Sequence, residues 1–121
     1  MQYLILIYGD EKQFAQMANS EVAKQVYAQY KQYSSALASA GVIRGGAELK
    51  PTSMATTVRV RNGKTQLTDG PFAETKEQLG GYYVIDVANL DEAVKWAARC
   101  PGAQAGSIEL RPLAMMPDMP A

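Results

Sequence analysis

The apolar segment Tyr3–Tyr8, with the sequence YLILIY, decides the fold of this 121-residue chain. Side chains alternate along a strand, which divides the segment into two sets on opposite faces: Leu4, Leu6 and Tyr8, and Tyr3, Ile5 and Ile7. Both sets are apolar, and a strand with two apolar faces has to be covered on two sides. The segment therefore predicts a sheet that is covered on each of its faces.

Two helices are predicted to supply one of these covers. The first runs from Glu21 to about Ala40, behind Ser20 as its N-cap and with apolar residues at helical spacing. The second begins at Asn89 or Asp91, continues through Arg99 and ends at Pro101-Gly102. Further strands are predicted over Val42–Leu49, with a bulge or a close approach of another segment at Gly45-Gly46, over Tyr82–Val87 and over Ser107–Leu113.

A β-hairpin is predicted around Asn62-Gly63, a dipeptide that favours a type I′ turn. Its strands are Thr56–Arg61 and Lys64–Thr68, and the two-residue turn extends the pairing to Thr56 opposite Asp69. Asp69 then shares a face with Val58 and Leu67. Partial desolvation there would suit a carboxylate that acts as a general base.

The order β-α-β-(hairpin)-β-α-β predicts an α+β fold, with helices on one face of an antiparallel sheet. Two helices cover only one face, and the second apolar face is too large to remain in water. We therefore expect a homodimer in which two chains pack these sheet faces together about a two-fold axis.

Composition excludes several classes of function. Twelve acidic and twelve basic residues balance, which argues against a nucleic-acid partner. No segment resembles a signal peptide or a membrane helix, and a single cysteine, Cys100, fits a reducing compartment, so a cytoplasmic location is expected. The chain has no histidine, which excludes Ser-His and Cys-His pairs and the usual zinc sites. No metal or cofactor is predicted.

The connection Asp69–Gly81 carries the main candidate site, because it joins two strands and concentrates charged residues and glycines. Asp69 is the candidate catalytic base, although aspartates before Gly-Pro commonly serve the turn alone. The charges of the connection are compatible with one helical turn that includes Glu74, Lys76 and Glu77. This turn would be either a wall over a ligand or ordinary solvated surface. The candidate ligand-binding residues are Tyr8, Arg44, Pro71, Phe72, Glu74, Lys76, Gly80, Gly81 and Tyr82.

The motif Asp69-Gly-Pro-Phe-Ala-Glu-Thr-Lys-Glu, followed by Gly80-Gly81-Tyr82, resembles the DGPF-domain proteins of the YCII-related superfamily. The resemblance includes Tyr8-Gly-Asp10, Thr57-Val-Arg-Val60, Leu90-Asp-Glu-Ala93 and Ser107-Ile-Glu-Leu-Arg-Pro112. It implies one domain over residues 1–113, followed by a Met/Pro-rich tail over 114–121. It also implies a ferredoxin-like subunit that dimerises as a dimeric α/β barrel.

The resemblance implies a bacterial protein of unknown biochemical function, with a possible link to sigma factors. Related YCII proteins carry a histidine–aspartate pair. This chain has no histidine, and it has Cys100 before Pro101, where those proteins have an acid before a proline. Three functions stay open: a small-molecule binding or sensing dimer, a cofactor-independent enzyme with Asp69 as base, and an interaction module for a transcriptional regulator.

Overall fold

The structure, a computed structural model, describes residues 1–17 and 19–114. The predicted tail, apart from Ala114, lies outside the described residues. The elements follow in the order β1 (Gln2–Gly9), α1 (Glu11–Gln16), α2 (Glu21–Ser39), β2 (Ile43–Glu48), the 3-10 turn η1 (Thr52–Met54), β3 (Thr56–Arg61), β4 (Lys64–Asp69), β5 (Gln78–Asp86), α3 (Leu90–Arg99), α4 (Gly102–Ala105) and β6 (Ser107–Pro112).

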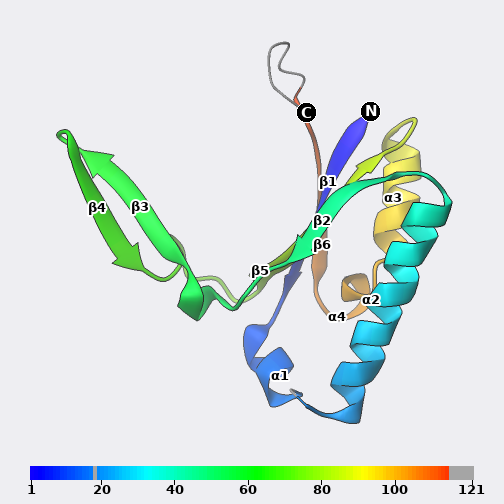
Figure 1. Ribbon diagram of the computed structural model, residues 1–121, viewed down its shortest axis with the longest axis horizontal. Helices are drawn as coiled ribbons and strands as arrows, with labels where there is room; N and C mark the ends of the chain where they lie inside the picture. The colour runs from blue at the N-terminus through cyan, green and yellow to red at the C-terminus, as the bar shows by residue number, and fades with distance from the viewer. Residues whose placement is uncertain (18, 115–121) are drawn as a thin grey trace.

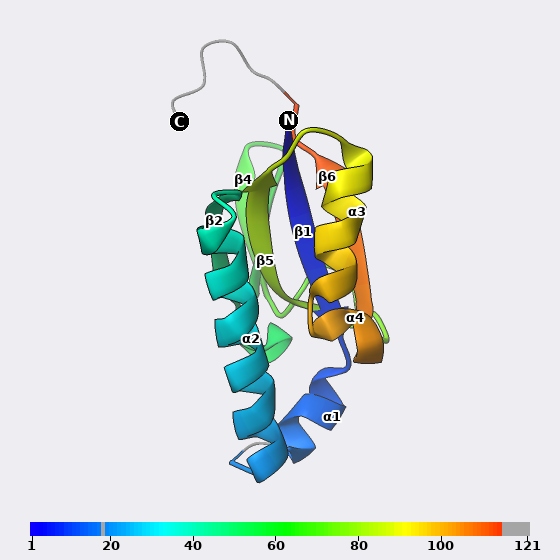
Figure 2. The same cartoon turned by 90° about the vertical axis from the view of Figure 1, so that its right-hand side faces the viewer.

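Four strands form the main sheet in the order β2-β5-β1-β6, and every neighbouring pair is antiparallel. Helices α2 and α3 lie side by side on one face of this sheet (Figure 2). This is a ferredoxin-like α+β fold, as predicted. Strands β3 and β4 form a separate two-stranded sheet, which stands on the side of the main sheet opposite the helices (Figure 1).

The predicted helix caps are confirmed. The Ser20 side chain accepts a hydrogen bond from the Ala23 amide at 3.2 Å, and the Asn89 side chain accepts one from the Glu92 amide at 3.0 Å. Sequence patterns did not predict α1, because six residues with no buried member show no helical periodicity. Its start is nevertheless capped by Asp10, whose carboxylate accepts a hydrogen bond from the Lys12 amide at 2.9 Å.

The hairpin and the bulge also follow the sequence. Asn62 and Gly63 both have positive φ, 52° and 73°, as a type I′ turn requires. The β2–β5 register shifts between Ile43 and Gly45, which confirms an irregularity at the paired glycines. At Gly46 a Cβ atom would lie 2.8 Å from the Tyr82 carbonyl oxygen, so only glycine allows the two strands to approach this closely.

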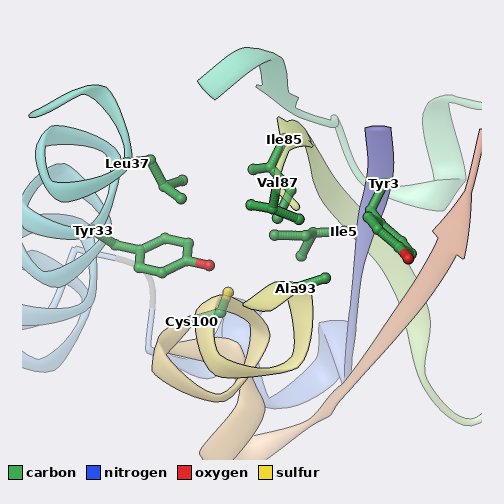
Figure 3. Packing of buried hydrophobic residues seen from close by; sticks show 8 residues of the cluster. All are labelled: Tyr3, Ile5, Tyr33, Leu37, Ile85, Val87, Ala93 and Cys100. Carbon is green, nitrogen blue, oxygen red and sulfur yellow. The ribbon is translucent and has the colours of Figure 1, made fainter. Parts of the chain in front are cut away.

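The core lies between the sheet and the helices. Figure 3 shows its eight members, which come from β1, α2, β5, α3 and the residues that directly follow β5 and α3: Tyr3, Ile5, Tyr33, Leu37, Ile85, Val87, Ala93 and Cys100. Buried polar groups in this layer are paired, since the Tyr33 hydroxyl donates to the Trp96 carbonyl at 2.7 Å. Cys100 is 1% exposed and packs in the core as a small apolar residue.

Candidate functional site

The face of the main sheet turned away from the helices carries an apolar strip. Antiparallel partners share a face, and the register places Leu4 opposite Val84 and Leu6 opposite Tyr82. We call this strip the open face and define it by Leu4, Leu6, Tyr8, Tyr82 and Val84, all of which are only partly buried. The second apolar face predicted from Tyr3–Tyr8 therefore exists, and this chain does not cover it fully.

The borders of the open face differ in chemistry. On the β6 side Glu109 lies opposite Leu6 and Arg111 opposite Leu4, and their side chains form an ion pair. On the β2 side the residues opposite Val84 and Tyr82 are small, namely Gly45 and Ala47. The open face thus has a charged pair of side chains along its β6 edge and only small residues along its β2 edge.

The connection between β4 and β5 is held at both of its ends. At its start, the Gly70 amide donates to the Ala55 carbonyl at 2.7 Å, and the Thr57 hydroxyl donates to the Gly70 carbonyl at 2.8 Å. At its end, the Glu77 carboxylate accepts from the Ser107 hydroxyl at 2.7 Å. Gly70 has a φ of 94°, a conformation that favours glycine, which explains the glycine after Asp69.

Asp69 lies where the register predicts, opposite Thr56 and on the same side of the hairpin as Val58 and Leu67. It is, however, exposed, because that side of the hairpin is itself uncovered. Val58 is 59% and Leu67 is 69% exposed, so these neighbours do not remove water from the carboxylate. Among residues 1–17 and 19–114, no hydrogen bond uses the Asp69 carboxylate. The desolvation expected at Asp69 is therefore absent within the single chain.

The structure brings together only part of the predicted ligand-binding set. Tyr8 and Tyr82 lie on the open face, whereas the buried Gly81 lies opposite Ile7, which packs against the core on the helical side. The predicted members from the connection are all exposed: Pro71, Phe72, Glu74 and Lys76. Phe72 is the most exposed large apolar side chain of the described residues, at 80%. These side chains all lie on the exposed segment that follows Asp69.

One local prediction about the connection is wrong. Residues 74–77 form no helical turn; bends there lead directly into β5. Gly80 and Gly81 lie inside β5, which begins at Gln78. A Cβ atom at Gly81 would lie 3.1 Å from the Ala47 carbonyl oxygen. This glycine therefore serves close strand pairing rather than a turn.

Arg44 is separate from the connection. It lies near the end of β2 that pairs with Ile85, whereas the connection enters β5 at its other end, at Gln78. Its guanidinium is 3.7 Å from the Asp86 carboxylate. A hydrogen bond from the terminal amine of Met1, together with the charges of that amine and of Arg44, lowers the pKa of Asp86. Arg44 therefore belongs to a charge cluster at the opposite end of the sheet.

One anchoring residue was not singled out from the sequence. The Glu11 carboxylate accepts hydrogen bonds from the Thr52 amide at 2.8 Å and from the Thr52 hydroxyl at 2.7 Å. The Glu11 amide donates to the Gln78 side chain at 3.0 Å. Glu11 thus ties η1 and the start of β5 to α1. No sequence pattern relates residues 41 and 67 positions apart, so only the fold reveals this role.

A polar groove of about 300 Å³ lies on the helical side, away from the open face. It is lined by Gln29, Gln32, Tyr33, Ala36, Arg99, Pro101 and Gln104. Within the described part of the chain, no group of three or more acidic or cysteine side chains is arranged to hold a metal ion. No helix of the described residues is long and apolar enough to cross a membrane.

Comparison with known proteins assigns the family. A model of the YCII-related domain matches residues 1–117. The chain belongs to the YCII-related family. An uncharacterized protein of Rhizobium meliloti (strain 1021) is similar to it, with 42% identity over 120 residues that span 95% of this chain and 94% of the relative. In this YCII-related protein the cysteine before Pro101 is buried, and burial raises the pKa of the Cys100 thiol. Cys100 is therefore a neutral core residue.

Proposed function

We propose that this YCII-related protein is a small-molecule binding or sensing homodimer, with its ligand between the open face and the connection that follows Asp69. The observation that carries the proposal is the partly buried apolar strip of the open face, which no helix of residues 1–17 and 19–114 covers. An apolar surface of this kind on a small domain marks an interaction site. A second chain and a ligand between the two sheets would together remove it from water.

The polar groups around the strip suit recognition of a ligand. The phenol groups of Tyr8 and Tyr82 supply hydroxyls that can donate or accept hydrogen bonds. Arg111, with a side chain 69% exposed, supplies a positive charge at the β6 edge. Phe72 supplies an aromatic ring on the exposed segment that follows Asp69. Such a set fits an organic molecule that carries an apolar body and one polar or anionic end.

The setting we propose is a bacterial cytoplasm, with binding coupled to regulation and with sigma factors as partners. This follows from the family resemblance and from the use of a single cysteine. Catalysis by Asp69 is the alternative use of the same site. In that case Asp69→Asn would abolish turnover of the bound molecule while leaving its binding intact.

A thermal-shift screen against a metabolite collection tests the proposal, because a ligand that binds only the native state raises the melting temperature. We expect at least one compound to stabilise the protein and Tyr82→Ala to remove that response. Arg44→Ala is the matched control, since it changes an exposed residue at the other end of the sheet. A screen without any hit, or a hit that Tyr82→Ala leaves unchanged, would contradict a site on the open face.

A further inference from the structure

The β3–β4 hairpin, which we call the arm (residues 56–69), has two chemically different sides. The register places Val58, Val60 and Leu67 on one side, and these side chains are 59%, 59% and 69% exposed. The alternate positions on the other side are polar and include three cations, Arg59, Arg61 and Lys64. An amphipathic ribbon usually buries its apolar side, yet in the single chain both sides of the arm face solvent.

A two-stranded ribbon on its own is only marginally stable in water. The arm is joined to the rest of the chain at its base, where the Gly70 amide donates to the Ala55 carbonyl and the connection returns to β5. Its strands belong to a sheet of their own and pair with no strand of the main sheet. The fold of one chain therefore leaves the apolar side of the arm without a cover.

The position of the arm indicates what covers it. The arm stands on the side of the main sheet that faces away from the helices, which is the side of the open face (Figure 1). Two uncovered apolar β-surfaces of one chain thus lie on the same side. A second copy that packs on the open face has to lie beside the arm. Under two-fold symmetry each chain presents both surfaces to its partner, so one arrangement covers both.

The charges agree with this arrangement. On its apolar side the arm carries one charged group, Asp69, near its base. At the border of the open face, Arg111 opposite Leu4 is already paired with Glu109 opposite Leu6, so this border carries no net charge that would repel Asp69. When the apolar side faces the partner, Arg59, Arg61 and Lys64 point to solvent. Repulsion between these like charges also disfavours pairing of two arms through their polar sides.

We infer that the arm of each protomer packs its apolar side on the partner subunit beside the open face, so that each ligand site is built from both chains. Asp69 and Phe72, which are exposed in the single chain, then become part of a closed site. This inference rests on the dimer of the proposed function and adds a specific role for the arm. It explains why the candidate carboxylate is exposed in the single chain.

Two neighbouring substitutions test the role of the arm. Leu67→Asp places a charge on the apolar side, whereas Gln66→Asp places the same charge on the polar side one residue away. Both positions are exposed in the single chain, so neither change should prevent folding. By sedimentation equilibrium we expect Leu67→Asp to raise the dimer dissociation constant about tenfold or more, and Gln66→Asp to change it by less than about threefold.

Hydrogen exchange of the unmodified protein supplies a readout that needs no variant. Amides of the arm should be protected at concentrations where the dimer forms and should lose that protection when the dimer is diluted to monomers. Amides of β1, which lies inside the main sheet, should stay protected at both concentrations and serve as the internal reference. Equal exchange of the arm in monomer and dimer would overturn the inference.

The outcomes separate the inference from the proposed function. If Leu67→Asp and Gln66→Asp leave the dimer equally stable while Leu4→Asp dissociates it, the dimer stands and the role of the arm is wrong. If the unmodified protein is a monomer, the dimer and the role of the arm both fail. If Leu67→Cys chains become linked to each other on oxidation, the arms meet each other, which overturns their placement on the partner's sheet.

Discussion

The two faces of the main sheet show how differently one sequence treats two apolar surfaces. Ile85 and Val84 are neighbours on β5; Ile85 is fully buried under the helices, while Val84 on the open face is only partly buried. The helical face is complete within one chain and holds the fold together. The open face and the apolar side of the arm remain partly or fully exposed in one chain. The helical side therefore supplies the stability of one chain, and the open side is where we propose that recognition takes place.

The largest expected effect comes from truncating the helical face. Ile85→Ala should lower the free energy of unfolding by about 2–5 kcal/mol, because it removes buried methyl groups and leaves a cavity. Val84→Ala, on the adjacent position, should cost about 1 kcal/mol or less in protein diluted to monomers. Urea titrations of both variants measure the difference. Equal costs would show that the two faces are equally buried and would break the comparison.

A smaller effect is expected from the buried hydroxyl of Tyr33. Tyr33→Phe should lower the free energy of unfolding by about 1–2 kcal/mol at neutral pH, since the Trp96 carbonyl loses its hydrogen-bond donor. Burial raises the pKa of Tyr33 above its ordinary value of 10.0. The neighbouring Cys100 and Tyr83 raise this pKa further, by smaller amounts. Burial likewise raises the pKa of Tyr30.

These shifts give the pH dependence its sign. Below about pH 10 both hydroxyls are neutral in the folded and the unfolded chain, so their contribution is fully present. Above pH 10 the unfolded chain releases these protons first, so the free energy of unfolding falls as pH rises. The fall should be shallower in Tyr33→Phe than in the unmodified protein. Denaturant titrations between pH 8 and about 11 measure it, and identical slopes would argue against a buried neutral Tyr33.

The smallest effect is expected at the exposed charge cluster. Arg44→Ala removes an ion pair with Asp86 in which both side chains are more than a third exposed. Exposed pairs contribute little, so the melting temperature should change by less than about 2 °C. A calorimetric scan checks this value. A larger loss would show that the end of the sheet near Met1 contributes to stability as much as the helical face does.

Much of the fold could be predicted from local chemistry. Ser20, Asn89 and the Asn62-Gly63 turn carry their structural role in their own side chains or conformations, and all three predictions are confirmed. The helix α1 and the early start of β5 could not be predicted in this way. They depend on contacts between distant residues, such as the hydrogen bond from the Glu11 amide to Gln78.

The candidate site could be predicted only in part, for a related reason. Alternation along the strands correctly placed Leu4, Leu6 and Tyr8 on one face of β1 and Asp69 on the apolar side of the hairpin. Alternation does not say whether a face is covered, and Asp69 is exposed because the arm has no cover in its own chain. It also does not measure distance along a strand, which is why Arg44 was grouped with residues at the other end of the sheet.

The most direct test of the central claim is the oligomeric state of the unmodified protein by analytical ultracentrifugation at micromolar concentration. The open face and the arm predict a dimer, and they predict that Leu4→Asp on the open face shifts it towards monomer. A substitution on the polar side of the arm, Gln66→Asp, should leave the dimer in place. A monomer at micromolar concentration would contradict the claim that a second copy completes the unfinished side of the sheet.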